Sequence, residues 1–258
     1  FTVSVGACNS VKIDGDLTVD GSLQLTSGTL NFSDASLTID GTVTGSGSLS
    51  GNGSSDLTVT TAGGLTGSLN FATGGQTVNN FTINVGSGTS VAVGSALTVN
   101  GALNLNGGSG ININGQSLTI GTNGSITGSG SITANSSSSL TINATGGNAA
   151  SISIVGGVIG SLTVNSGSGS TVTLGSDLTV SNTLSLQGGT LVLAGYDLTI
   201  DGDIAAGGSG NLSSTSASDV TISTNTSTSG SLSFSGSGNA VGDLNIDLGG
   251  NGSSASIG

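Results

Sequence analysis

Short triplets with an apolar residue on each side of a polar one recur from one end of the chain to the other. Leu97-Thr98-Val99 is typical, and the central residue of every copy is Thr or Asn. Because successive side chains of a β-strand point to opposite faces, each triplet predicts a short strand with two buried side chains and one exposed side chain. The triplets begin at Leu17, Leu37, Leu57, Phe81, Leu97, Leu118, Leu140, Leu162, Leu178, Leu198, Val220 and Leu244.

The spacing of the triplets predicts a repeat protein. Neighbouring triplets follow one another at about 20 residues, a period that is typical of solenoids. A longer period of four triplets relates Leu17, Leu97 and Leu178. We therefore expect one β-solenoid domain over 1–258, with a partial coil followed by three super-repeats: 1–16, 17–96, 97–177 and 178–258.

Each coil is expected to contain about three strands. In the first coil, apolar residues at Leu17, Leu23, Leu30 and Leu37 are separated by turn residues such as Asp20-Gly21. Stacked coils of this kind form a right-handed parallel β-helix, here with about twelve coils and narrower ones at the short steps that follow Phe81 and Leu162. A leucine-rich repeat and a hairpin-based propeller or barrel fit the pattern less well. The inward columns should contain Leu17, Val19, Leu37, Ile39, Leu97, Val99, Leu118, Ile120, Leu178, Val180, Leu198 and Ile200.

The composition of the chain disfavours some classes of binding partner. The net charge of −12 comes from 13 acidic residues, all Asp, against the single Lys12. A chain with so few cations is a poor ligand for nucleic acid or for an anionic membrane surface, and it has no apolar run long enough to cross a bilayer. Cys8 is the sole cysteine, and we expect a partly buried small residue there in preference to a reactive thiol.

Several sequence segments resemble repeats of very large secreted surface proteins of Bacteroidota and their relatives. They include Gly45-Ser46-Gly47-Ser48-Leu49-Ser50-Gly51 and Thr173-Leu174-Gly175-Ser176-Asp177-Leu178-Thr179-Val180. Proteins of that group are adhesin-like, and many carry a sorting domain for type IX secretion. The resemblance covers essentially the whole chain and implies a secreted, cell-surface location.

The inventory of residues excludes most catalytic chemistry. Without His, Arg or a second Cys, the chain has no Ser-His-Asp triad and no His or Cys metal site. Paired carboxylates of a carbohydrate-active enzyme are the remaining option, and turn chemistry at Asp-Gly is the simpler explanation. The candidates are Asp14, Asp16, Asp20, Asp197, Asp201 and Asp203.

The outward positions of the triplets suggest a binding face. Thr suits exposed strands and cross-strand ladders, and a flat Thr array is also what ice-binding solenoids present. Ice binding is the alternative to a purely structural role for these threonines, and thermal hysteresis of the purified protein would distinguish the two. Polysaccharide is a second candidate ligand. The residues are Thr18, Thr38, Thr58, Thr82, Thr98, Thr119, Thr141, Thr163, Thr179, Thr199 and Thr221.

Aspartates recur beside the triplets and suggest a weak Ca²⁺ site. They are Asp177, Asp197, Asp219 and Asp243 before four consecutive triplets, and Asp20 and Asp40 after two others. If the coils stack in register, Ca²⁺ could bridge neighbouring carboxylates. The alternative is that these side chains stay solvated or accept bonds from nearby N–H groups.

The sequence favours a non-catalytic structural module of a secreted cell-surface protein, either a rigid stalk or a fibre-forming adhesin segment. Its partners would be further copies or repeats joined end to end, because solenoid ends expose unpaired strands. Surface glycans are a further candidate. The alternatives are an ice- or polysaccharide-binding solenoid and a carbohydrate-active enzyme.

Overall fold

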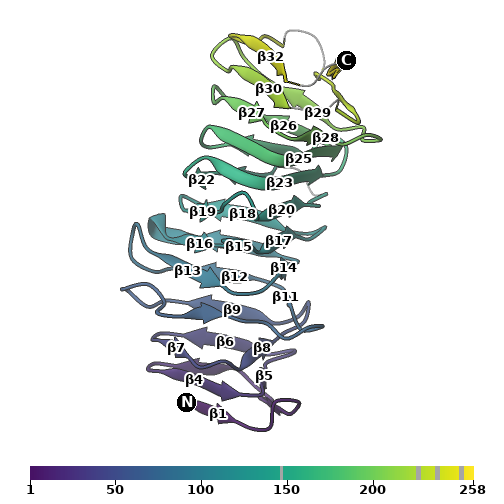
Figure 1. The fold of residues 1–258 in the computed structure, drawn as a ribbon. Coiled ribbons are helices and arrows are strands. Elements are labelled where there is room, and N and C mark those ends of the chain that lie inside the picture. Colours follow the sequence, from purple (N-terminus) through teal and green to yellow (C-terminus); the bar gives the residue numbers. More distant parts are fainter. Residues whose placement is uncertain (146–147, 225–227, 236–238, 250–252) are drawn as a thin grey trace. The chain divides into compact units, whose positions relative to one another are not determined.

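The chain forms a right-handed parallel β-solenoid of about 11 turns, which confirms the fold expected from the triplets. The computed structural model describes residues 1–145, 148–224, 228–235, 239–249 and 253–258, with the side chains of 148–150 left aside. Two compact units, Phe1–Thr133 and Ala134–Gly258, divide the chain. Each unit is a stack of short strands in parallel ladders (Figure 1).

The first unit pairs each strand with the equivalent strand of the next coil. Its longest ladder contains β3 (Leu17–Val19), β6 (Ser36–Ile39), β9 (Asp56–Val59), β12 (Phe81–Ile83), β15 (Ala102–Leu105) and β18 (Ser125–Gly128). The other ladders are β1 (Thr2–Ser4), β4 (Leu23–Ser27) and β7 (Val43–Thr44); β2 (Ser10–Lys12), β5 (Thr29–Asn31) and β8 (Ser48–Ser50); β10 (Ser68–Leu69), β13 (Ser90–Val93), β16 (Gly110–Asn112) and β19 (Ser131–Thr133); and β11 (Thr77–Val78), β14 (Leu97–Val99) and β17 (Ser117–Ile120). A short 3₁₀ turn, η1, covers Asn106–Gly108.

The second unit is built in the same way but contains two long strands, β23 and β25. One ladder contains β20 (Ser139–Ile142), β23 (Val158–Asn165), β25 (Leu178–Gly188), β27 (Leu198–Ile200), β30 (Val220–Thr224) and β32 (Leu244–Leu248), with β28 (Asp203–Ile204) also paired to β25. A second contains β21 (Asn148–Ile152), β24 (Thr171–Leu174), β26 (Thr190–Val192) and β29 (Asn211–Ser213). The remaining strands are β22 (Ile154–Val155), β31 (Ser231–Leu232) and β33 (Ser256–Ile257).

The core consists of stacked apolar columns, as the alternation of the triplets predicts. Of the twelve residues expected to point inward, all are buried except Leu17, which is half-buried in the first coil. In β14 and β17, Leu97 pairs with Leu118 and Val99 with Ile120, so like side chains stack on one another. This stacking removes apolar surface from water in strands too short to be stable alone.

Serine occupies some inward positions where the chain turns. At Asn52–Ser55, the Ser55 N–H donates to the Asn52 carbonyl (3.0 Å) and the Asn52 N–H donates to Ser55 Oγ (3.0 Å). The buried Ser55 hydroxyl also donates to the Phe32 carbonyl in the preceding coil (3.1 Å). Ser109 repeats this arrangement with the Ile83 carbonyl (2.9 Å). A turn can therefore enter the core without leaving its polar groups unsatisfied.

The expectation of narrow coils at the short steps is wrong. The coil that starts at Phe81 does not close at Leu97 but at Leu103, its partner in β15. Leu97 instead pairs with Leu118 in another sheet. A short step therefore carries the triplet pattern to a different side of the solenoid. For the same reason, the longer period of four triplets is a repeat of the sequence and not of the structure, since Leu17 and Leu97 lie in different ladders of the first unit.

Candidate functional site

The predicted threonine face does not form one surface. In the first unit, Thr18, Thr38, Thr58 and Thr82 stack on one ladder, whereas Thr98 and Thr119 stack on another. In the second unit, Thr141 pairs with Thr163, and a separate column contains Thr179, Thr199 and Thr221. In the first unit the series changes ladder because the short step between triplets is less than a full turn. In the second unit it stays in one ladder but changes position along the long strands β23 and β25, where Thr163 pairs with Ser185 and Thr179 pairs with Val158, so the array is several short columns.

Within a column, the outward side chains bond to one another. Thr82 pairs with Asn104 in the next coil, and Asn104 pairs with Thr127 in the coil after that. Asn104 Nδ2 donates to Thr82 Oγ1 (3.1 Å), and Thr127 Oγ1 donates to Asn104 Oδ1 (2.6 Å). Hydroxyls and amides engaged in this way stabilise neighbouring coils. Ice or polysaccharide binding by these threonines stays a prediction.

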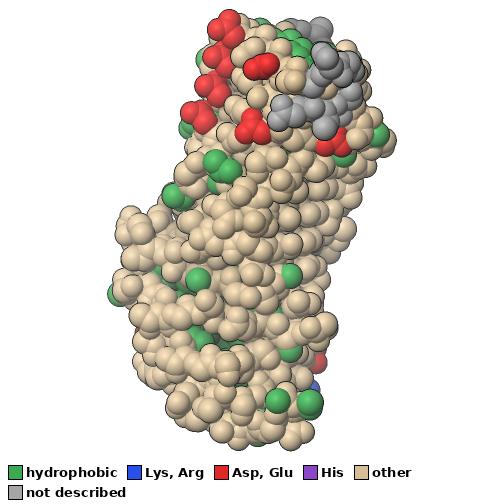
Figure 2. All heavy atoms as spheres, in the orientation of Figure 1, with side chains coloured by type: hydrophobic (Ala, Val, Ile, Leu, Met, Phe, Trp, Pro, Cys, Tyr) green, Lys and Arg blue, Asp and Glu red, His purple; other side chains and the backbone are tan. Residues whose placement is uncertain are grey.

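The four aspartates before consecutive triplets form a ladder of hydrogen bonds, which we call the aspartate ladder (Asp177, Asp197, Asp219 and Asp243). The N–H of Asp197 donates to Asp177 Oδ1 (3.0 Å), that of Asp219 to Asp197 Oδ1 (2.8 Å), and that of Asp243 to Asp219 Oδ1 (2.7 Å). The residues stack in register, which is the condition that the suggested Ca²⁺ bridging requires. Figure 2 shows acidic side chains in a row on the second unit.

The aspartate ladder has a structural explanation. At the start of a strand the preceding coil is still turning, so the carboxylate accepts from the first N–H in place of a backbone carbonyl. The first unit uses the same arrangement: Asp16 Oδ1 accepts from the Ser36 N–H (2.8 Å), and Asp56 Oδ1 accepts from the Asn80 N–H (3.0 Å). The bonding of these side chains to N–H groups was the alternative to a cation site.

Ca²⁺ binding stays a prediction for both aspartate groups. Asp20 and Asp40 are exposed and follow the paired residues Val19 and Ile39 in adjacent coils. The part of the chain that the structure describes contains no group of three or more His, Cys, Asp or Glu side chains placed to hold a metal ion. A bridging Ca²⁺ ion would therefore be held by two carboxylates, one from each of two successive coils.

Two substitutions of Asp197 distinguish the effect of its negative charge on stability from the effect of the hydrogen bond that it accepts. Asp197→Asn keeps the Oδ1 acceptor for Asp219 and removes repulsion between carboxylates about 5 Å apart, which is about 0.8 kcal/mol per pair in water. We expect a higher melting temperature for Asp197→Asn at low salt. Asp197→Ala should lower stability by about 1 kcal/mol, because the Asp219 N–H loses its partner.

The same measurement tests Ca²⁺. Equal melting temperatures of the wild-type protein in millimolar Ca²⁺ and in chelator would rule out bridging. A lower melting temperature for Asp197→Asn than for wild type in chelator would contradict the repulsion argument and show that the ladder needs the negative charge itself.

Three of the six carboxylates considered for catalysis accept structural hydrogen bonds, and Asp20 is exposed, as noted above. Asp16 and Asp197 belong to the strand-start arrangement described above. Asp203 Oδ1 accepts from the Ser229 N–H (2.6 Å), and its Oδ2 accepts from the Ser229 hydroxyl (2.5 Å). Asp14 and Asp201 are exposed. Cys8 is also exposed, so the expectation that it is partly buried is wrong.

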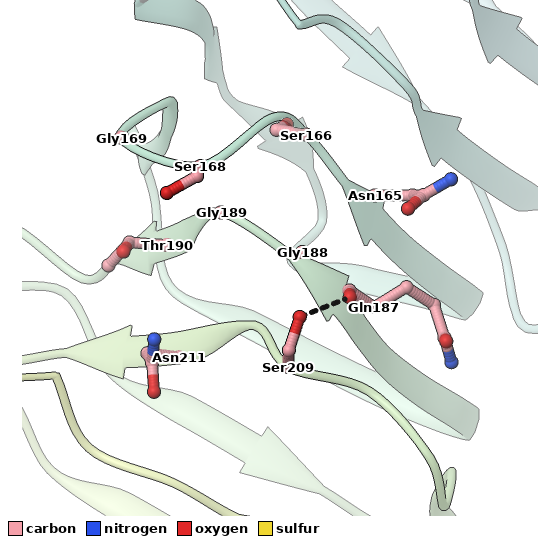
Figure 3. A pocket seen from close by; sticks show the side chains of 10 residues that line it. All are labelled: Asn165, Ser166, Ser168, Gly169, Gln187, Gly188, Gly189, Thr190, Ser209 and Asn211. Atoms are coloured by element: carbon pink, nitrogen blue, oxygen red, sulfur yellow. Dashed lines mark hydrogen bonds between the residues drawn. The ribbon is translucent and has the colours of Figure 1, made fainter.

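The sequence analysis missed a hollow in the second unit, which we call the corner notch. Its volume is about 300 Å³, and it spans the turns of three successive coils. Gly188 and Gly189 form its floor, and its polar rim consists of Asn165, Ser168, Gln187, Thr190, Ser209 and Asn211 (Figure 3). The available sequence signal was the very short turn between Gln187 and Thr190.

Turn lengths explain the corner notch. Gly189 alone connects β25 to β26. Between paired residues, three residues separate Leu186 from Thr190 where six separate Val164 from Thr171, and five separate Leu184 from Thr190 where six separate Ile204 from Asn211. The short middle turn therefore lies recessed between two longer ones. Gly189 has φ +74°, and a Cβ there would lie 2.8 Å from Ser166 Cβ, so the position requires glycine.

The fold defines the class of protein, a parallel β-solenoid repeat protein. Comparison with protein-family models, with curated proteins and with solved structures finds no match for the chain. Among the described residues, no helix has the length and apolar character that a membrane crossing requires.

Proposed function

We propose that the chain is a non-catalytic structural module of a secreted cell-surface protein, acting as a stalk or as a fibre-forming adhesin segment. The observation that carries this proposal is the cohesion between successive coils. Backbone ladders, apolar columns and outward side-chain bonds all join one coil to the next, as at Thr82, Asn104 and Thr127. An architecture whose polar side chains bond to its own coils suits a load-bearing spacer.

The charge distribution supports the same proposal. No ionisable side chain occurs between Asp56 and Asp177, and this long stretch is rich in Ser, Thr, Asn and Gly. A neutral, hydrated surface attracts neither a charged ligand nor a charged partner over a distance. This surface fits a segment that separates or displays other parts of a protein.

Unpaired strand edges support assembly with further copies of the chain. Within the described residues, β32 pairs on one side only, with β30, and β3 pairs on one side only, with β6. Leu244 and Ile246 continue the inward column of β30 but are 43% and 42% exposed. Because each edge strand ends a parallel ladder, head-to-tail pairing with a second copy would bury these edges and produce an open, linear assembly.

Assembly is testable by sedimentation velocity and electron microscopy over a range of concentrations. We expect end-to-end filaments that lengthen with concentration, and their loss in the double variant Leu244→Asp/Ile246→Asp. The matched control, Ser213→Asp/Asn245→Asp, adds the same charge at outward positions of the same unit and should still assemble. A monodisperse wild-type monomer at high concentration would contradict the proposal.

A further inference from the structure

We infer that the corner notch binds a neutral polyhydroxylated ligand, namely one or two sugar units of an uncharged glycan. This inference goes beyond the proposed structural role and does not depend on assembly. It concerns a site distinct from the threonine columns. Three observations carry it: the depth and origin of the notch, the chemistry of its rim, and an unsatisfied hydroxyl beside it.

The corner notch is a fixed feature of the backbone. Its floor is held between neighbouring coils by the Ser166 N–H, which donates to the Gly188 carbonyl (3.2 Å), and by the Asn211 N–H, which donates to the Gly189 carbonyl (2.9 Å). With no side chain on its floor, the notch lets a ligand approach the backbone closely. A hollow of about 300 Å³ lies at the lower end of the range for small-ligand sites.

The rim consists of amides and hydroxyls alone. Figure 3 shows Ser168 and Ser209 on opposite sides of the glycine floor, with Asn165 and Gln187 to one side and Thr190 and Asn211 to the other. None of the lining residues is ionisable, so a charged ligand would lose hydration without gaining an opposite charge. Sugar hydroxyls, which both donate and accept, match such groups.

The internal bonds of the rim leave acceptors for a ligand. Asn165 Nδ2 donates to Asn143 Oδ1 (3.2 Å), and Gln187 Nε2 donates to Ser185 Oγ (2.7 Å). The Ser209 hydroxyl donates to the Gln187 carbonyl (3.2 Å). In each case the protein uses a donor of the side chain and leaves its oxygen as an acceptor. Each of these side chains can therefore accept from a ligand O–H group without giving up its internal bond.

Ser166 supplies the third observation. Its side chain lines the corner notch and is 4% exposed, and among the described residues its Oγ is a buried polar atom without a hydrogen-bond partner. Buried hydroxyls are normally satisfied, and an unsatisfied one calls for an explanation. A serine hydroxyl reorients by rotation about χ1 alone, so a ligand oxygen in the notch can become its partner.

The test is ligand-detected NMR and calorimetry on the whole chain, with maltose, cellobiose and N,N′-diacetylchitobiose as probes and glucuronic acid as the charged comparison. With no aromatic side chain to stack on a sugar, we expect millimolar affinity for a neutral disaccharide, which corresponds to about −4 kcal/mol. Ser168→Phe, which fills the notch, should weaken binding at least tenfold. Ser137→Phe places the same side chain on an exposed turn elsewhere in the unit and should not change it.

Ser166→Ala adds a readout that a purely structural serine would not give. Removal of an unsatisfied hydroxyl should leave the melting temperature unchanged or raise it, while sugar binding becomes weaker. The proposal is overturned if no neutral disaccharide binds at tens of millimolar, if Ser168→Phe binds like wild type, or if glucuronic acid binds more tightly than the neutral sugars. Failure to assemble would leave these results unaffected.

Discussion

Replacement of Leu118 by aspartate is expected to lower the free energy of unfolding by about 3–5 kcal/mol. Leu118 is 1% exposed and stacks on Leu97 in the adjacent strand of the first unit. The substitution removes apolar contacts and places a carboxylate where the inward column offers it no cation. Urea or thermal unfolding followed by circular dichroism would measure the loss.

Thr119→Asp is the matched control, because Thr119 is the next residue of the same strand and points outward. The same charge should cost less than about 1 kcal/mol there, since surface substitutions seldom cost more. Equal effects at Leu118 and Thr119 would show that the alternation of the triplet does not determine which side chain faces the core. A Leu118→Asp variant with wild-type stability would contradict the inward columns directly.

Gly41→Ala is expected to destabilise the first unit by about 1–3 kcal/mol, although it adds a single methyl group. A Cβ on Gly41 would lie 2.0 Å from the carbonyl oxygen of Gly21 in the preceding coil. Neither group can move away by rotating a side chain, because both belong to the backbone. The substitution therefore forces two stacked turns apart and strains the ladder bonds beside them.

Gly21→Ala provides the control within the same column of turns. A Cβ on Gly21 would meet nothing within 4 Å, and its φ lies outside the left-handed region. We expect a change of no more than a few tenths of a kcal/mol, with either sign, because alanine restricts the unfolded chain. If Gly41→Ala and Gly21→Ala have the same melting temperature, the close approach of the two turns is wrong.

The two glycines show a limit of the sequence. Asp20-Gly21 and Asp40-Gly41 are the same dipeptide after equivalent triplets, and turn chemistry explains both. The distance from each glycine to the neighbouring coil depends on how the turns stack, which local sequence does not describe. The exposure of Cys8 is a similar case, because the usual burial of cysteine says little about one particular turn.

The site predictions had mixed success for related reasons. The suggestion about the aspartates required the coils to stack in register, and they do, because the spacing from Asp177 to Asp197, Asp219 and Asp243 follows that of the paired triplets. The threonine face was expected as one surface, and the structure divides it. The corner notch was not anticipated, since it results from a one-residue turn at Gly189 between two longer turns, and no side chain marks it.

By itself, the sequence determined the local geometry of this protein: short strands, inward and outward positions within each triplet, and parallel stacking of coils of similar length. These features follow from alternation and turn chemistry over a few residues at a time. The tertiary structure alone decided which triplets share a column, which glycines touch the next coil, and where the surface is hollowed. Those outcomes depend on how the turns of successive coils stack. Steps of 20 and 24 residues keep Leu37, Leu57 and Phe81 in one ladder, whereas the 16-residue step to Leu97 is less than a full turn and places that triplet in another ladder.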